Sequence, residues 1–80
     1  MKEFLETIVR QLVNNPDEVR VEEEDTERGL RLVLSVAQED MGKVIGRDGR
    51  IAKAIRTIIK AAGNKTGVKY SVVILEADEQ

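Results

Sequence analysis

The sequence of 80 residues contains no cysteine, no histidine and no tryptophan. Disulfide bonds are therefore impossible, and a metal site built on thiolate or imidazole ligands is excluded. Aromatic residues are nearly absent as well. Only Phe4 and Tyr70 occur, and both stand at apolar positions of expected elements, so we predict that they lie in the core. Modules that stack bases on exposed aromatic rings, such as RRM and OB domains, are thereby excluded.

Long apolar runs are also lacking. No segment approaches the ~20 apolar residues that a membrane-spanning helix requires. Glu3, Glu6 and Arg10 interrupt the stretch where a signal peptide would have its apolar core. We therefore expect no membrane association and a cytoplasmic location.

The residues that catalysis needs are equally scarce. No serine stands beside an evident base, and the glycine-rich segment lacks the Gly-Lys-Ser/Thr ending of a nucleotide-binding P-loop. An acidic run, residues 22–25 together with Glu27, offers carboxylates. We interpret this run as a solvated hairpin tip that mildly repels a polyanion, and not as a metal site. We expect no enzymatic activity and no cofactor.

The residues that are present suit one globular domain. Hydrophobic residues make up 41% of the chain and charged residues 35%, a balance that argues against disorder. A chain of this length supports one core. We predict a single domain over residues 1–80, in which residues 76–80 form a frayed tail.

The charges are unevenly distributed along the chain, although the net charge is only −2. Residues 1–40 carry eleven acidic and five basic side chains. Residues 41–69 carry eight basic side chains and a single acid, Asp48, which gives a local charge of +7. Such asymmetry predicts one surface that faces a polyanion and another that is held away from it.

Hydrophobic periodicity predicts six elements in the order α-β-β-α-α-β. They are helix 2–13, strand 19–25, strand 29–37, helix 39–45, helix 49–62 and strand 68–75. The segment Asn14-Asn15-Pro16 ends the first helix, and Gly63-Asn64 ends the longest one. Helices and a three-stranded sheet in this order predict an α+β fold, a two-layer sandwich in which all helices cover one face of the sheet.

The helix expected at 49–62 has two distinct faces. We predict that its core side consists of Ile51, Ile55, Ile58, Ile59 and Ala62. The opposite side consists of Arg50, Lys53, Arg56 and Lys60. A solvated helix usually mixes glutamate with lysine, so a face of one sign indicates contact with a polyanion.

The segment that leads into this helix carries the most specific pattern. It reads Val44-Ile45-Gly46-Arg47-Asp48-Gly49-Arg50-Ile51, in which two glycines flank two charged residues between an apolar pair and a helix. Glycine permits positive φ and the close approach of another backbone. A helix start offers unpaired amide hydrogens and partial positive charge, which suit a phosphate. Arg47 and Arg50 add further positive charge at the same place.

This segment resembles the Gly-x-x-Gly signature of KH domains, and the order of elements over residues 2–75 is similar to the type II KH arrangement. Residues 14–19 and 49–57 are similar, more narrowly, to the small stand-alone bacterial KH proteins of the KhpA family. The resemblance implies a type II KH-like sandwich that binds single-stranded RNA in a groove between two helices and an adjoining strand, about four nucleotides long. It also implies a role in bacterial RNA metabolism or as an RNA chaperone, in some relatives together with a larger KH-containing protein.

The resemblance assigns site residues by position. The loop that orients the phosphates would consist of Gly46, Arg47, Asp48 and Gly49. The apolar side of the groove would be lined by Val44 and Ile45. The basic residues beside the loop would be Arg50, Lys53 and Arg56. Asp48 departs from the family pattern, because it puts a negative charge at a loop position that is often neutral or basic. We expect it to weaken phosphate binding unless it points away or caps the following helix.

The sequence leaves an alternative function open, that of a KH-shaped module that binds mainly protein, as a homodimer or with a larger partner. Val33, Val73 and Leu75 motivate this alternative, since they place apolar surface on the sheet face away from the helices. The sequence does not fix the oligomeric state, the RNA sequence preference or the identity of protein partners.

Overall fold

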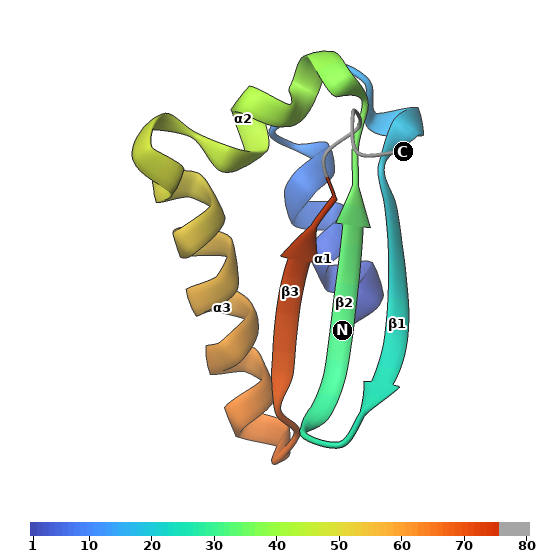
Figure 1. The fold of residues 1–80 in the computed structure, drawn as a ribbon, viewed down its shortest axis with the longest axis vertical. Helices are drawn as coiled ribbons and strands as arrows, with labels where there is room; N and C mark the ends of the chain where they lie inside the picture. The colour runs from blue at the N-terminus through green and yellow to red at the C-terminus, as the bar shows by residue number, and fades with distance from the viewer. Residues whose placement is uncertain (76–80) are drawn as a thin grey trace.

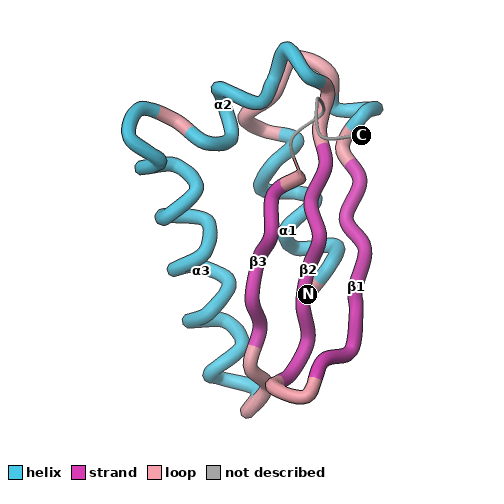
Figure 2. Tube along the Cα trace, viewed as in Figure 1, coloured by secondary structure: helices cyan, strands magenta, loops and turns pink. Residues whose placement is uncertain are grey.

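A computed structural model of the chain describes residues 1–75, and its elements follow the predicted order (Figure 1). The helices are α1 (Lys2–Arg10), α2 (Met41–Ile45) and α3 (Arg50–Thr66). The strands are β1 (Arg20–Thr26), β2 (Gly29–Ser35) and β3 (Tyr70–Ile74). Short 3-10 turns lie in the connections, at Pro16–Glu18, Gln38–Asp40 and Arg47–Gly49 (Figure 2). The frayed tail predicted for residues 76–80 lies outside the described residues.

The three strands form one mixed sheet in the order β1-β2-β3. β1 and β2 are antiparallel, with Val21 opposite Leu34, and only Glu27 and Arg28 lie in the turn between them. β2 and β3 are parallel, and the segment that contains α2 and α3 provides the crossover that a parallel pair requires. β3 is therefore an edge strand, and α3 runs beside it (Figure 1).

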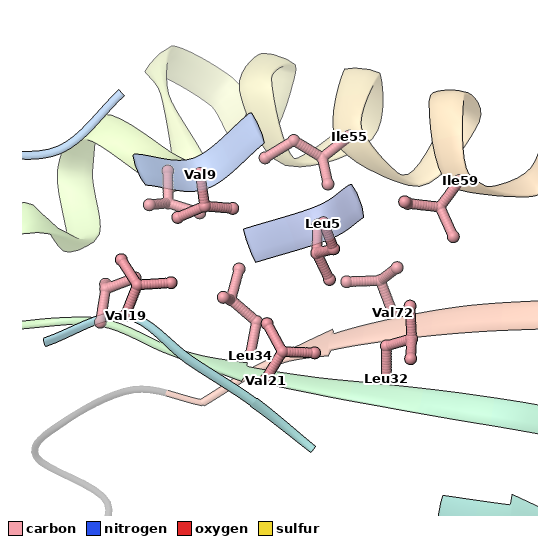
Figure 3. Packing of buried hydrophobic residues seen from close by; sticks show 11 residues of the cluster. Leu5, Val9, Val19, Val21, Leu32, Leu34, Ile55, Ile59 and Val72 are labelled. Carbon is pink, nitrogen blue, oxygen red and sulfur yellow. The ribbon is translucent and has the colours of Figure 1, made fainter. Parts of the chain in front are cut away.

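The helices pack against one face of the sheet, which confirms the predicted two-layer α+β sandwich (Figure 3). The core between the layers draws on every helix and strand. Its members include Leu5 and Val9 of α1, Val21 of β1, Leu32 and Leu34 of β2, Val44 of α2, Ile55 and Ile59 of α3, and Val72 of β3. Burial of a side chain of this size contributes about 1.5–3 kcal/mol, so this cluster is the main source of stability.

Helix α1 ends at Arg10 and is shorter than the predicted helix 2–13. Leu5 and Val9, one turn apart, are fully buried against the sheet. Phe4 precedes Leu5 by one residue and therefore points about 100° away from this direction. Phe4 is 45% exposed, so the prediction that it lies in the core is wrong. Tyr70, the other aromatic residue, is half-buried and packs against the core.

Helix α3 is longer than predicted. It continues through Gly63, ends at Thr66 and is followed by Gly67 at φ +78°, so Gly63 is not the stop signal. The buried face of the helix consists of Ala52, Ile55, Ile59 and Gly63. At 100° per residue this face is centred about 60° away from the predicted one. Ile58 consequently lies outside the core and is 44% exposed, contrary to prediction.

The ends of the strands differ from the predicted ends by at most two residues. The predicted alternation of buried and exposed side chains along β3 is confirmed. Val72 is buried, whereas Val73 and Leu75, the residue that follows the strand, are 38% and 46% exposed. Within residues 1–75, no helix combines the length and the apolar character that crossing a membrane demands.

Candidate nucleic-acid interface

The connection between α2 and α3 is a tight turn built on two glycines. Gly46 has φ +75° and ψ 176°, and Gly49 has φ +74°, backbone conformations that residues with a side chain rarely adopt. The Gly49 amide donates a hydrogen bond to the Gly46 carbonyl at 3.2 Å, which closes the turn. The path of the backbone therefore favours glycine at both positions.

The two glycines differ in their surroundings. A Cβ atom at Gly46 would lie 2.7 Å from Ile51 Cγ1 and 3.0 Å from the Ile51 amide nitrogen, so the first turn of α3 fills this space. A Cβ atom at Gly49 would have no neighbour within 4 Å among the described residues, apart from the adjoining Asp48 and Arg50. Gly46 is thus needed for packing as well as for conformation, whereas Gly49 presents bare backbone on an open side of the loop.

Asp48 lies between these glycines with φ +56° and ψ +25°. This left-handed conformation costs most residues about 1–2 kcal/mol, although aspartate tolerates it better than most. Helix α3 begins at Arg50, one residue later than predicted, and no side chain of the described residues caps its first turn. Asp48 is exposed and does not cap the helix, so its negative charge remains beside the loop.

The basic residues nearest the loop are exposed to solvent. Arg47, Arg50 and Lys53 take part in neither of the two ion pairs found among residues 1–75. The partial positive charge at the start of α3 adds to theirs. These three cations outnumber the single carboxylate of Asp48, so the exposed residues in and after the loop carry net positive charge.

Arg56 is placed differently, about two turns farther along α3. Its Nε donates a hydrogen bond to the carbonyl oxygen of Val72 at 3.3 Å, which attaches it to the edge strand β3. A shallow depression between α3 and β3 is lined by Arg56, Lys60, Tyr70, Ser71 and Val72. Arg56 therefore borders a groove along the seam between helix and strand.

The apolar pair before the loop has two separate roles. Val44 is fully buried in the core, so the prediction that it lines a groove is wrong. Val44 lies one turn after Met41 on the side of α2 that packs against the sheet, and this periodicity explains its burial. Ile45 is half-buried, as is Ile51, against which Gly46 packs. Ile45 and Ile51 supply the apolar surface beside the loop.

Asp40, a residue that the sequence reading missed, is fully buried directly before α2. Its carboxylate accepts hydrogen bonds from the backbone amides of Asn14 and Asn15 at 3.1 and 2.9 Å, and from the Asn15 side-chain amide at 3.0 Å. Burial alone would raise the pKa of Asp40, but these hydrogen bonds and the charge of Lys43 together lower it below its ordinary value.

Asp40 therefore ties the turn after α1 to the start of α2 and fixes the helix that leads into the loop. In the sequence, Asp40 falls inside the helix predicted at 39–45, where no local pattern marks it as buried. It makes no side-chain capping bond to α2 within the described residues, because its oxygens face the other way, toward Asn14 and Asn15.

The strongly acidic part of the chain lies away from the loop. Figure 1 places the turn between β1 and β2 at the opposite end of the molecule from the connection between α2 and α3. Glu24 of this hairpin pairs with Arg31 at 3.3 Å. In the part of the chain that the structure describes, no group of three or more acidic residues could hold a metal ion. The acidic hairpin is thus separated in space from the loop at residues 46–49 (Figure 1), whereas Lys69, at the end of the basic part of the chain, lies beside the hairpin.

The chain is similar to known bacterial proteins along nearly its whole length. The model of the KhpA/KhpB KH domain matches residues 2–74. A Clostridium acetobutylicum protein named RNA-binding protein KhpA is 57% identical over 75 residues, which cover 94% of this chain and 100% of that protein. Proteins of the same name from Clostridium perfringens and Listeria monocytogenes are 52% and 47% identical, over 94% and 95% of this chain and 100% of each relative.

Proposed function

The chain belongs to the KhpA/KhpB family of KH domains, and from this premise we propose that it binds single-stranded RNA without catalysing a reaction. The loop at residues 46–49 holds the sugar-phosphate backbone, and bases lie in the groove between the two helices and β3. The proposed site residues are Ile45, Gly46, Arg47, Asp48, Gly49, Arg50, Lys53 and Arg56. The cellular role that we propose is in bacterial RNA metabolism or as an RNA chaperone, in the cytoplasm.

One observation carries this proposal: bare backbone, positive charge and a helix start meet at one place. A phosphate can approach Gly49 closely, because no described residue other than its chain neighbours Asp48 and Arg50 has an atom within 4 Å of the position of its missing Cβ. Arg47 and Arg50 are exposed and lie within two residues of Gly49 in the chain, and α3 begins directly after Gly49 without a side-chain cap, which leaves its first amides free to bind an anion. Such contacts position a strand, while half-buried Ile45 and Ile51 offer apolar surface to its bases.

The decisive variant is Arg47→Asp, which reverses the charge of an exposed loop residue without touching the core. Its matched control is Arg20→Asp, which makes the same change at an exposed position on β1. We expect Arg47→Asp to abolish binding of a labelled single-stranded RNA in fluorescence anisotropy, and Arg20→Asp to retain it. Circular dichroism establishes that both variants fold. Equal RNA affinity of the two folded variants would place the RNA site elsewhere.

The dependence of the RNA-binding constant on salt concentration gives a second test of this proposal. Three or four phosphate contacts predict a slope of about −2 to −3 for the logarithm of the binding constant against the logarithm of salt concentration, at roughly −0.7 per contact. We expect a competing duplex to leave the complex intact, because a narrow groove requires splayed bases. A slope near zero contradicts a loop that binds RNA by its charge.

A second candidate function is binding to another copy of the chain through the outer face of the sheet. Val73 and Leu75 are 38% and 46% exposed there, and Val33 lies opposite Val73 in the register. Sedimentation of wild type and of Val73→Lys tests this function, since a dimer held by this face should dissociate in the variant. A larger KH-containing partner would compete for the same face. Tight dimerisation without RNA binding at low salt would make protein binding the main function.

A further inference from the structure

Tyr70 is shared by three adjoining surface depressions along the seam between α3 and β3. The first, which Arg56 borders, also contains Lys60. The second continues from Lys60 to Lys69. The third lies where the turn between β1 and β2 meets the start of β3, and its lining includes Arg28 and Lys69. The first and second depressions share Lys60 and Tyr70, and the second and third share Lys69 and Tyr70, so the three adjoin one another, and together they are named the track.

Every charged side chain that lines this track is basic. The cations are Arg28, Arg31, Arg56, Lys60 and Lys69, and no carboxylate lines any of the three depressions in the described part of the chain. Arg31 is paired with Glu24, whereas the other four take part in no ion pair within residues 1–75. The chain as a whole has a net charge of −2. A groove in which every charged side chain is basic is therefore unusual for this chain and suits the binding of a polyanion.

The ring of Tyr70 is fixed in place by the helix beside it. A Cβ atom at Gly63 would lie 2.7 Å from Tyr70 Cδ2 and 3.4 Å from Cε2, so one edge of the ring rests on the bare backbone of α3. Tyr70 is half-buried, and its remaining surface lines the track. An aromatic ring held beside lysines is the arrangement on which unpaired bases stack.

We infer that the RNA path continues from the loop along the α3–β3 seam, with one base stacked on Tyr70 and phosphates held by Lys60 and Lys69. This inference rests on the proposed function and extends the same site. The 17 residues of α3 rise by about 25 Å along the helix axis. Lys69 follows the C-terminal end of this helix, whereas the loop lies at its N-terminal end. A four-nucleotide strand centred on the loop does not reach Lys69, whereas a longer strand does.

The chain offers a direct reporter of this event. Tyr70 is its single tyrosine and it has no tryptophan, so intrinsic fluorescence reports on this ring alone. The wild-type protein is titrated with strands of four and of ten nucleotides, with free tyrosine amide as the correction for light absorbed by RNA. We expect both strands to bind by anisotropy, and only the ten-nucleotide strand to quench tyrosine emission.

Two sets of variants distinguish the contribution of the lysine charges to RNA binding from that of base stacking on Tyr70. Lys60→Gln/Lys69→Gln is expected to weaken binding of the ten-nucleotide strand severalfold, to reduce its salt slope by about 1.4, and to leave the four-nucleotide strand unaffected. The matched control, Lys2→Gln/Lys65→Gln, removes the same charge from exposed positions outside the track. Tyr70→Phe retains the ring and should bind as wild type, whereas Tyr70→Leu should lose affinity for the longer strand only.

Two outcomes overturn the inference while leaving the loop function intact. One is unchanged tyrosine emission when the ten-nucleotide strand saturates the protein. The other is equal affinity of the two double variants for that strand. Failure of the wild-type protein to bind either strand at low salt overturns the proposed function itself, and this extension with it.

Discussion

Gly63 of α3 and Tyr70 of β3 meet without an intervening side chain. A Cβ atom at Gly63 would lie 2.7 Å from Tyr70 Cδ2 and 2.6 Å from the carbonyl oxygen of Val68. The helix passes this point without interruption and ends at Thr66. Gly63 therefore sets how closely α3 approaches β3, and with it the width of the seam that Arg56 and Tyr70 border.

We predict that Gly63→Ala destabilises the protein by about 1 kcal/mol or more. Overpacking costs about 1–3 kcal/mol, and the gain of about 1 kcal/mol in helix propensity offsets only part of it. The matched variant is Gly42→Ala in α2, where the new Cβ would meet no described atom within 4 Å. It should stabilise the protein by about 0.5–1 kcal/mol. Urea denaturation of both variants measures the free energies of unfolding.

If the free energy of unfolding changed by the same sign and amount in Gly63→Ala and Gly42→Ala, helix propensity would determine the effect at both positions. The contact between α3 and β3 would then be able to adapt to a methyl group, and the proposed dependence of the seam on Gly63 would be wrong.

Gly63 also shows which features of the fold cannot be predicted from local sequence patterns. A glycine after an apolar helical stretch usually marks the end of the helix. No local sequence rule indicates that the packing of β3 instead requires a residue without a side chain at this point of α3. The same packing turns the buried face of α3 toward Ala52 and Gly63 and leaves Ile58 exposed. The rotation depends on the neighbouring strand and could not be predicted from periodicity alone.

The turn at Gly46 and Gly49 could be predicted because its determinants are local, namely two glycines at a fixed spacing before a helix. Asp40 could not be predicted, since its partners Asn14 and Asn15 lie 26 and 25 residues away in the sequence. The order of elements followed from periodicity, whereas a buried charge depends on contacts that only the folded chain creates.

We predict that Asp40→Asn destabilises the protein at neutral pH, and that the loss depends on pH. An amide at this buried site turns a donor toward the amides of Asn14 and Asn15, where an acceptor is needed. The pKa of Asp40 in the folded state lies below the ordinary 3.8, so the unfolded state binds the proton first as the pH falls. The stabilisation is therefore complete above 3.8 and is lost as the pH falls through the folded pKa.

Thermal denaturation of wild type and Asp40→Asn over a range of pH measures this dependence. The difference in stability should shrink below pH 3.8 and vanish at the acid end. Asp17→Asn, at an exposed position in the neighbouring turn, is the control and should remain close to wild type throughout. A difference that stays constant across the range would mean that the charge of Asp40 contributes nothing and that only the replacement of a hydrogen-bond acceptor by a donor matters.

We predict that Asp48→Asn raises RNA affinity severalfold, because it removes a negative charge that no cap or ion pair among residues 1–75 engages. Asparagine tolerates the left-handed conformation as aspartate does, so stability should be unchanged. Asp48→Gly should raise affinity equally and stabilise the protein by about 1 kcal/mol, since glycine adopts φ +56° without strain.

Anisotropy of the four-nucleotide strand at two salt concentrations checks this prediction, with Glu27→Gln as the control for loss of an acid far from the loop. Weaker binding by Asp48→Asn would show that the carboxylate accepts a hydrogen bond from the RNA. The interpretation of Asp48 as an unfavourable charge would then have to be abandoned.

The two loop glycines should respond differently to alanine. At Gly46, φ +75° and ψ 176° fall in a region that costs a residue with a side chain about 1–3 kcal/mol, and the methyl group would overlap Ile51. We therefore expect Gly46→Ala to unfold much of the population and to lose RNA binding for that reason. At Gly49 the cost is about 1–2 kcal/mol without overlap, so Gly49→Ala should remain folded.

Gly49→Ala is thus the variant that separates the role of the loop in folding from its role in binding. Its methyl group would occupy the open side of the turn, where the proposed phosphate approaches the backbone most closely. Thermal melting identifies a temperature at which the variant is fully folded, and anisotropy at that temperature should show a clear loss of RNA affinity. If the folded variant binds RNA as tightly as wild type, the strand does not lie against Gly49, and the exposed arginines alone must hold it.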